Sequence, residues 1–152
     1  MKILIIRLSS LGDVVLTTPV PRLLRKKFPN SEIHFITKSE YSDIYINNNN
    51  VNKVINLEQN LKKTIKFLKS EKYDLVIDLH NNLRSNIIKY SLSVKNFTYN
   101  KQSFARWLFS NLKIKLVIKH ITKSYIETLN NLDIEDDDKG LDLFLHEKDL
   151  YD

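Results

Sequence analysis

Two short apolar runs constrain the fold of this chain more than any other feature of its sequence. Residues 2–8 (KILIIRL) and 74–79 (DLVIDL) are rich in isoleucine, leucine and valine. Such continuous runs are typical of strands buried on both faces, as in a parallel sheet covered by helices. The segments that follow each run carry polar loops and helical patterns, so we expect strands and helices to alternate.

The remaining elements are predicted from the same kind of pattern. One helix should run from Gly12 or Asp13 to Phe28, kinked or split at Pro19 and Pro21. We expect further strands over 32–38, 53–57, 94–99 and 141–145, and further helices over 61–72, 83–92, 104–112 and 119–132. The sequence therefore predicts an α/β, Rossmann-like three-layer domain with a mostly parallel sheet.

The charge of the chain is unevenly distributed. The formal net charge is +6, yet residues 133–152 hold nine acidic and two basic side chains, so the rest of the chain carries +13. A body this basic attracts phosphates, anionic lipid headgroups or nucleic acid, although a lysine-rich surface also simply favours solubility. The chain has no cysteine, and no apolar run is long enough for a signal peptide or a membrane span. We therefore expect a cytoplasmic protein.

Several common motifs for nucleotide binding and catalysis are absent from the sequence. It has no P-loop, no nucleophile elbow and only two glycines, Gly12 and Gly140, so it lacks the glycine-rich turn that binds a dinucleotide. The four histidines do not fall at metal-ligand spacing, and no thiolate is available. We therefore expect neither a metal nor a cofactor.

The loop after the first apolar run is the strongest candidate for chemistry. It reads Ser9-Ser10-Leu11-Gly12-Asp13 and lies where a helix begins. The glycine permits a tight turn, and free backbone amides at a helix start favour an anion. Asp13 can act there as a general base towards a substrate hydroxyl. The alternative is that Asp13 only stabilises the helix dipole while Ser9 or Ser10 caps the helix.

A second polar loop follows the second apolar run. It offers His80, Asn81, Asn82, Arg84 and Ser85 at the same edge of the sheet, where ligands of such sheets bind. Arg84 suits a phosphate or a carboxylate. The alternative is that one asparagine caps the next helix and that Arg84 is solvated.

A third candidate is His120, in the helix expected over 119–132. Ile121, Tyr125 and Leu129 recur there at helical spacing, which indicates a side that faces the core. His120 can face a cleft beside them, but a single histidine in such a helix is more often structural.

The chain resembles the lipopolysaccharide heptosyltransferases, the ADP-heptose-using glycosyltransferases of family 9 with a GT-B fold. The resemblance rests on ILIIRLSSLGDVVLTTPVPRLLRKKFPNSEI, in which Ser-Ser-x-Gly-Asp follows a strand and precedes Thr-x-Pro. It continues in KVINL, YDLVIDLHNNLRS and HITKSYIETLNNL. It covers almost the whole chain and corresponds to the N-terminal domain of that family.

The resemblance implies the acceptor-binding half of an enzyme with two Rossmann-like domains. Residues 1–145 would form this half, and residues 146–152 would begin an interdomain linker or a donor-binding domain. The family likeness makes Asp13 the base in a metal-independent, inverting transfer of a heptose-like sugar from ADP-heptose. It implies a phosphorylated, lipid-linked acceptor from the lipopolysaccharide core, reached at the anionic inner face of the cytoplasmic membrane. We expect this chain alone to transfer no sugar.

The same likeness implies which residues bind substrate. Gly12 and Ser10 would shape the turn near the donor phosphates. The residues expected to bind substrate are Ser9, Ser10, Gly12, Asn81, Asn82, Arg84, Ser85 and His120. Many relatives have glutamine and glycine where this chain has His80-Asn81-Asn82. The alternative function is a non-catalytic module that binds anions or nucleic acid, but no RNA-binding or helix-turn-helix pattern supports a nucleic-acid partner.

Overall fold

A parallel sheet of five strands forms the centre of the structure. The computed structural model describes residues 1–101 and 114–145. Its strands are β1 (Lys2–Ile6), β2 (Glu32–Thr37), β3 (Lys53–Asn56), β4 (Leu75–Asp78) and β5 (Lys95–Thr98). They lie in the order β3-β2-β1-β4-β5, and every neighbouring pair is parallel. The predicted α/β domain with a mostly parallel sheet is confirmed.

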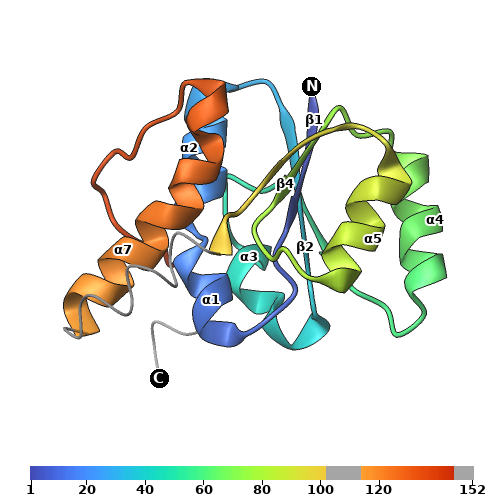
Figure 1. Cartoon of the computed structure of the whole chain (residues 1–152), viewed down its shortest axis with the longest axis horizontal. Coiled ribbons are helices and arrows are strands. Elements are labelled where there is room, and N and C mark those ends of the chain that lie inside the picture. Colours follow the sequence, from blue (N-terminus) through green and yellow to red (C-terminus); the bar gives the residue numbers. More distant parts are fainter. Residues whose placement is uncertain (102–113, 146–152) are drawn as a thin grey trace.

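Helices cover both faces of this sheet and give the fold three layers (Figure 1). On one face lie α1 (Leu11–Leu16), α2 (Pro19–Lys27), α3 (Asp43–Ile46) and α7 (Ile114–Ile126). On the other face lie α4 (Leu61–Glu71) and α5 (Leu83–Leu92). Two 3-10 helices, η1 (Ser39–Tyr41) and η2 (Glu127–Leu132), complete the described elements.

The central strand β1 contributes to two separate hydrophobic cores. Ile3 and Ile5 pack with side chains from α1, α2, α3 and α7, whereas Leu4 and Ile6 pack with side chains from α4 and α5. All four side chains are fully buried. Successive side chains of a strand point to opposite faces, so a strand covered on both faces needs apolar residues throughout.

Most of the expected elements lie within one or two residues of their predicted bounds. The first helix is split at the prolines as predicted, because α1 ends at Leu16 and α2 begins at Pro19. The helix expected over 119–132 is formed by α7, which begins earlier, followed by η2. The helix expected over 104–112 lies outside the described residues.

The prediction of a strand over 141–145 is wrong, because this segment has no regular secondary structure. Its three leucines are 42–69% exposed. The guanidinium of Arg22 on α2 holds the segment by pairing with Asp137 and Asp142 and by donating a hydrogen bond to the carbonyl of Gly140. The leucines at alternate positions predicted a strand. In the structure, the segment is held by ion pairs with Arg22 rather than by hydrogen bonds to a neighbouring strand.

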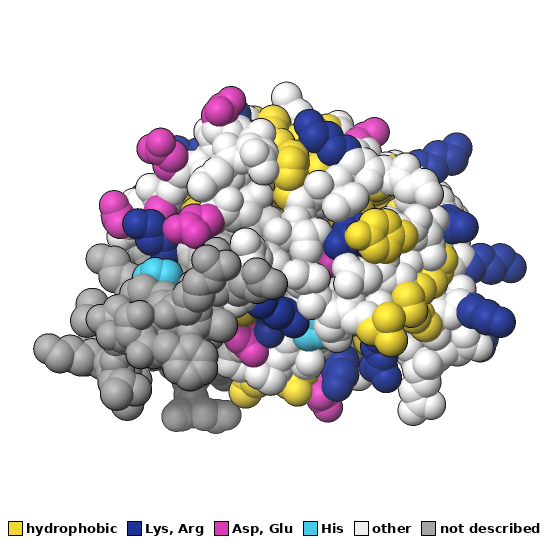
Figure 2. All heavy atoms as spheres, in the orientation of Figure 1, with side chains coloured by type: hydrophobic (Ala, Val, Ile, Leu, Met, Phe, Trp, Pro, Cys, Tyr) yellow, Lys and Arg dark blue, Asp and Glu magenta, His cyan; other side chains and the backbone are white. Residues whose placement is uncertain are grey.

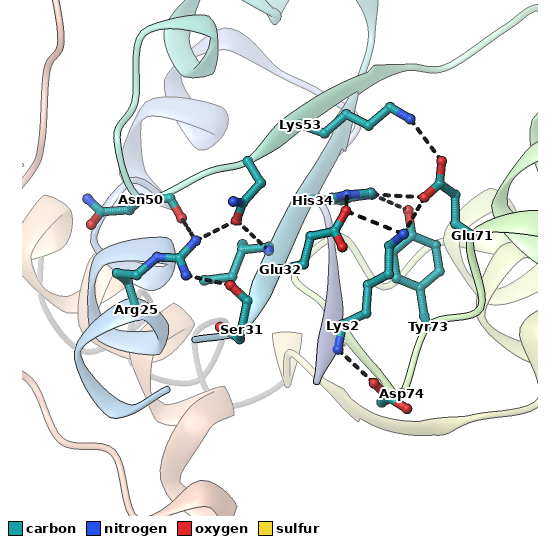
Figure 3. A network of polar contacts seen from close by, with 12 residues as sticks. Lys2, Arg25, Ser31, Glu32, His34, Asn50, Lys53, Glu71, Tyr73 and Asp74 are labelled. Atoms are coloured by element: carbon teal, nitrogen blue, oxygen red, sulfur yellow. Dashed lines mark hydrogen bonds and ion pairs between the residues drawn. The ribbon is translucent and has the colours of Figure 1, made fainter. Parts of the chain in front are cut away.

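A network of ion pairs fastens α4 to the amino-terminal edge of the sheet (Figure 3). The carboxylate of Glu71, at the end of α4, pairs with Lys2 and, at 2.8 Å, with Lys53. The ammonium of Lys2 also lies 3.4 Å from Glu32, the first residue of β2. The hydrogen bonds from Lys2 and Lys53 lower the pKa of Glu71 to about 2. The network therefore joins three strands to one helix.

A buried ion pair holds the loop between β4 and α5. Asp78 ends β4 and is fully buried, and its carboxylate lies 3.3 Å from the ammonium of Lys89. The same carboxylate accepts hydrogen bonds from the backbone amides of His80 and Asn81 and from the hydroxyl of Ser85. The last side chain of β4 thus fixes the loop that follows it.

Replacing Glu71 with glutamine should remove a pH-dependent contribution to stability. The folded-state pKa of Glu71 lies below its ordinary value of 4.5, so its carboxylate stabilises the fold above that pH, and this stabilisation is lost as the pH falls towards 2. Glu71→Gln should lower the free energy of unfolding by about 0.5–1 kcal/mol at pH 7. Denaturant unfolding at several pH values should show this deficit shrinking below pH 4.5, with Glu58→Gln, an exposed site, as the control. A deficit that does not change with pH would contradict the assignment.

Replacing Asp78 with asparagine should leave the ammonium of Lys89 buried without its counter-charge. We expect Asp78→Asn to lower the free energy of unfolding by about 3–5 kcal/mol, because an uncompensated buried charge is strongly destabilising. Adding Lys89→Met removes that charge, and the double variant should regain much of the loss. Urea unfolding measures both variants. A double variant that is less stable than Asp78→Asn alone would contradict the claim that the carboxylate of Asp78 compensates the buried charge of Lys89.

Candidate functional site

The loops after β1 and β4 meet at the carboxyl-terminal edge of the sheet. These two strands are parallel neighbours, and the chain continues from β1 towards β2 on one side and from β4 towards β5 on the other. Ligands of open α/β sheets bind at such a point, where the strand order reverses. The two polar loops singled out in the sequence therefore lie together.

Asp13 lies in the first turn of α1, with its side chain 35% exposed. One carboxylate oxygen, Oδ2, is 2.8 Å from a guanidinium nitrogen of Arg7 and accepts a 3.0 Å hydrogen bond from the Ser10 hydroxyl. The other, Oδ1, accepts a 3.1 Å hydrogen bond from the hydroxyl of Tyr125 on α7. Ser10 occupies the N-cap position of α1, but its side chain makes no capping hydrogen bond. Its hydroxyl donates its hydrogen bond to Asp13 instead.

The surroundings of Asp13 keep its carboxyl group ionised. Burial by itself would raise the pKa of Asp13, but the charge of Arg7 and the hydrogen bonds from Ser10 and Tyr125 outweigh burial and hold the pKa below its usual value. Asp13 is therefore a carboxylate at neutral pH, held by three partners and still open to solvent on one side.

Arg7 is a site residue that the sequence analysis did not identify. It follows β1 directly, is only 6% exposed, and donates a 2.8 Å hydrogen bond to the carbonyl oxygen of Leu79 in the loop after β4. Its guanidinium carbon lies 5.4 Å from the ring centroid of Tyr125. Its Nε has no hydrogen-bond partner among the described residues. The sequence analysis included Arg7 in the apolar run of residues 2–8, and only its contacts in the structure reveal its role.

His80 is a buried, uncharged group beside the same loops. Burial, followed by the positive charges of Arg7 and Lys101, lowers its pKa to about 4. The imidazole is therefore neutral at pH 7. Within the described part of the chain, its Nδ1 has no hydrogen-bond partner. Counting only partners from residues 1–101 and 114–145, this edge of the sheet thus has buried polar atoms without a hydrogen bond.

The residues of the second loop divide into those that build the loop and those that remain accessible. Asn82 and Ser85 form a capping box at the start of α5, which confirms that an asparagine caps this helix. Ser85 is fully buried, so it holds the loop in place rather than reaching solvent. Asn81 is half-buried and donates a hydrogen bond to the carbonyl of Tyr99. Arg84 is exposed on the first turn of α5.

The remaining candidate positions lie in the first loop and on α7. Ser9 is half-buried, and Gly12 is exposed inside α1. Gly12 lies in the first turn of α1 without a left-handed φ, and a Cβ added there would meet no atom within 4 Å, so the space beside the helix start is open as expected. His120 is half-buried on α7, five residues before Tyr125. Five residues turn a helix by about 140° beyond a full turn, so the two side chains leave α7 in different directions.

Among the described residues, one group has ligand atoms at a spacing suited to a metal ion. Glu32, His34 and Glu71 each offer an atom within 4.8 Å of the others, at the edge of the sheet opposite the two polar loops (Figure 3). The ammonium of Lys2 already pairs with both glutamates, and the hydroxyl of Tyr73 lies 2.8 Å from Nδ1 of His34. The protein's own cation thus balances these carboxylates, and the group acts as a structural network.

A curated protein matches the chain over part of its length. The chain is similar to lipopolysaccharide heptosyltransferase 1 of Campylobacter coli, with 33% identity over 109 residues. The match covers 68% of this chain and 32% of that protein, so the chain spans about a third of the length of this relative. No family model matches the chain.

Several solved structures share the fold. The glycosyl transferase family 9 protein of Veillonella parvula DSM 2008 has a TM-score of 0.76 and 22% identity, over 97% of this chain and 46% of that one. The E. coli heptosyltransferase WaaC with ADP-2-deoxy-2-fluoro heptose has a TM-score of 0.58 and 18% identity, over 86% of this chain and 49% of that one. The E. coli ADP-heptose lps heptosyltransferase II has a TM-score of 0.56 and 24% identity, over 62% and 29%.

At these identities the solved structures establish the fold, and the parallel sheet with its helices matches that of GT-B glycosyltransferases. The curated relative points to the same group of proteins. The resemblance of this chain to the lipopolysaccharide heptosyltransferases is therefore confirmed, over the part of those proteins that it spans.

Proposed function

We propose that this chain is the acceptor-binding part of an inverting glycosyltransferase in which Asp13 is the general base. The similarity to heptosyltransferases supports a role in glycosyl transfer. The observation that carries the proposal is the ionised, partly exposed carboxylate of Asp13 at the carboxyl edge of the sheet. The chain spans about a third of the length of its curated relative, so we assign the activity to a two-domain protein in which this chain is the acceptor-binding part.

The proposed chemistry is a single displacement at the anomeric carbon of a nucleotide sugar. The acceptor hydroxyl takes the place of the Tyr125 or Ser10 hydroxyl beside Asp13 and gives its proton to the carboxylate. Its oxygen forms the new glycosidic bond while the bond to the donor phosphate breaks, and the nucleotide leaves with that electron pair. Arg7 keeps Asp13 ionised before the reaction. A lowered pKa weakens the base, so orientation of the two reactants must supply much of the rate.

The proposed donor is a nucleotide sugar of the ADP-heptose type, used without a metal ion. Two solved structures of the E. coli heptosyltransferase WaaC carry ADP and ADP-2-deoxy-2-fluoro heptose. We assign acceptor binding to residues 1–145 and the start of a linker or donor domain to 146–152. Ser9, Ser10 and Gly12 border Asp13, and the open space beside Gly12 leaves room for substrate.

The proposed acceptor is a phosphorylated, lipid-linked sugar. Arg84 is exposed at the same edge of the sheet and suits its anionic groups, with Asn81 and Asn82 beside it. Across the part of the chain that the structure describes, no helix is both long and apolar enough to cross a bilayer. We propose a cytoplasmic protein that contacts the membrane peripherally, since the chain outside its acidic last 20 residues carries a net charge of +13.

Replacing Asp13 with asparagine tests the base. In a complete two-domain protein that contains this chain, Asp13→Asn should lower kcat by about 10²–10⁴-fold, because asparagine keeps the shape of the side chain but cannot accept the proton. Binding of the donor should change little. Release of ADP, followed with ADP-heptose and a lipid-linked acceptor, measures the rate.

The matched control is Asp43→Asn, which changes the exposed acidic residue in the first turn of α3 and should leave the rate unchanged. The 152 residues assayed alone should transfer no sugar, because in this proposal they supply acceptor binding and the base but no binding site for the donor. An Asp13→Asn enzyme that works at the parental rate would remove the base role and leave Asp13 as a helix-stabilising residue.

A further inference from the structure

A row of exposed apolar side chains runs along the outer face of α5. Leu83, Ile87 and Tyr90 are 76%, 40% and 70% exposed. Residues spaced by four and three positions lie on the same side of a helix, so the three side chains form one stripe. Figure 2 shows apolar side chains exposed on this part of the molecule, over α5 and α4. A single exposed leucine is ordinary, but a contiguous row marks an interaction surface.

Basic side chains border this stripe. On α4, which packs beside α5, Lys62, Lys66 and Lys69 share one side of the helix at the same spacing as the stripe and are all exposed. Arg84 lies next to Leu83 on α5 and is also exposed. Figure 2 shows Lys and Arg side chains around the exposed apolar ones. The outer face of the two helices is therefore both apolar and basic.

Little negative charge offsets these basic residues. The sequence of α4 and α5 contains one acidic residue, Glu71, and its carboxylate is already paired with Lys2 and Lys53. The positive charge of the face is thus available to an external partner.

A second exposed apolar group, on the other side of the sheet, has the opposite surroundings. Ile46 at the end of α3 is 56% exposed, and Leu143 in the irregular segment is 69% exposed. The acidic side chains of Asp43 and Asp142 lie on the same two segments. Of these two groups of exposed apolar side chains, the one on the α4–α5 face is combined with positive charge.

We propose that this α4–α5 face docks on a membrane surface that contains anionic lipids. Leucine, isoleucine and tyrosine side chains insert at the boundary between headgroups and acyl chains, and lysines attract anionic headgroups. Nucleic acid would use the lysines but would not account for the exposed Leu83 and Ile87. Leu83 follows the second polar loop directly, so a bilayer on this face lies next to the edge where the acceptor is proposed to bind.

This inference assigns the membrane contact of the proposed function to a particular face of the protein. It rests on the proposed function only where it relates this face to a lipid-linked acceptor. Docking is measured without donor or acceptor, so its failure and the failure of the Asp13 mechanism are separate results.

Vesicle sedimentation with the 152-residue chain tests the docking face. The chain should bind vesicles of phosphatidylglycerol and phosphatidylcholine, bind pure phosphatidylcholine at least about tenfold more weakly, and lose affinity as salt rises. The triple variants Leu83→Ser/Ile87→Ser/Tyr90→Ser and Lys62→Gln/Lys66→Gln/Lys69→Gln should each lose about tenfold or more in affinity. Circular dichroism checks that they fold.

Matched variants on other faces serve as controls. Ile46→Ser/Leu143→Ser removes exposed apolar surface elsewhere, and Lys26→Gln/Lys27→Gln/Lys139→Gln removes the same amount of charge, so both should bind vesicles like the parent. No sedimentation of the parent with anionic vesicles would overturn the proposal. Binding that needs the lysines but not the stripe would also overturn it and would indicate a polyanion such as nucleic acid.

A labelling experiment keeps the test independent of disruptive variants. The chain has no cysteine, so Ile87→Cys and Ile46→Cys each carry one site for an environment-sensitive fluorophore. With anionic vesicles, the label at position 87 should shift to shorter emission wavelength, and the label at position 46 should not. An unshifted label at position 87 would contradict docking through α5.

Discussion

The buried guanidinium of Arg7 joins the parts of the chain that make the candidate site. It lies at the end of β1, donates a hydrogen bond to Leu79 after β4, and pairs with Asp13 of α1. Tyr125 of α7 contacts both members of that pair, although it is 112 residues from Asp13 in sequence. The opposite charges of Arg7 and Asp13 compensate each other at a partly buried position. Either charge without the other would lower the stability of the fold there.

The two edges of the sheet differ in how completely their polar groups are satisfied. At the amino-terminal edge, Glu71 is bound on both sides by lysines, and His34 lies between Glu32 and Tyr73. At the carboxyl-terminal edge, the described residues provide no partner for Nε of Arg7 or for Nδ1 of His80. The first edge therefore stabilises the fold, whereas the second has buried polar atoms that a ligand would satisfy in the proposed function, at the point where the strand order reverses.

The elements that local signals define were predictable from the sequence. The helix over 83–92 was predicted with its observed bounds, because Asn82 begins it with a capping box and Ser93, in the left-handed region, ends it. The two apolar runs likewise gave β1 and β4. The strand over 141–145 failed because alternation predicts a strand without showing whether a partner strand is available, and Arg22 had already fixed that backbone.

The site was predictable only in part, because local sequence patterns do not show contacts between distant segments. The sequence pointed to Asp13 and to the loop after β4, since both follow buried strands. The roles of Arg7 and Tyr125 depend on contacts between distant segments, so neither spacing nor residue type revealed them. Ser85 resembled a ligand-binding residue, but its hydroxyl is used by Asp78 and by the helix cap.

The pKa of the Asp13 carboxyl, measured by NMR titration in the parent chain and in Arg7→Met, tests the central claim most directly. The claim is that Arg7 holds Asp13 ionised at the open edge of the sheet. The parent should show a pKa below the ordinary aspartate value, and the variant a clearly higher one, because burial then acts without the compensating charge. A parental pKa at or above the ordinary value, or one that does not respond to the loss of Arg7, would contradict the account.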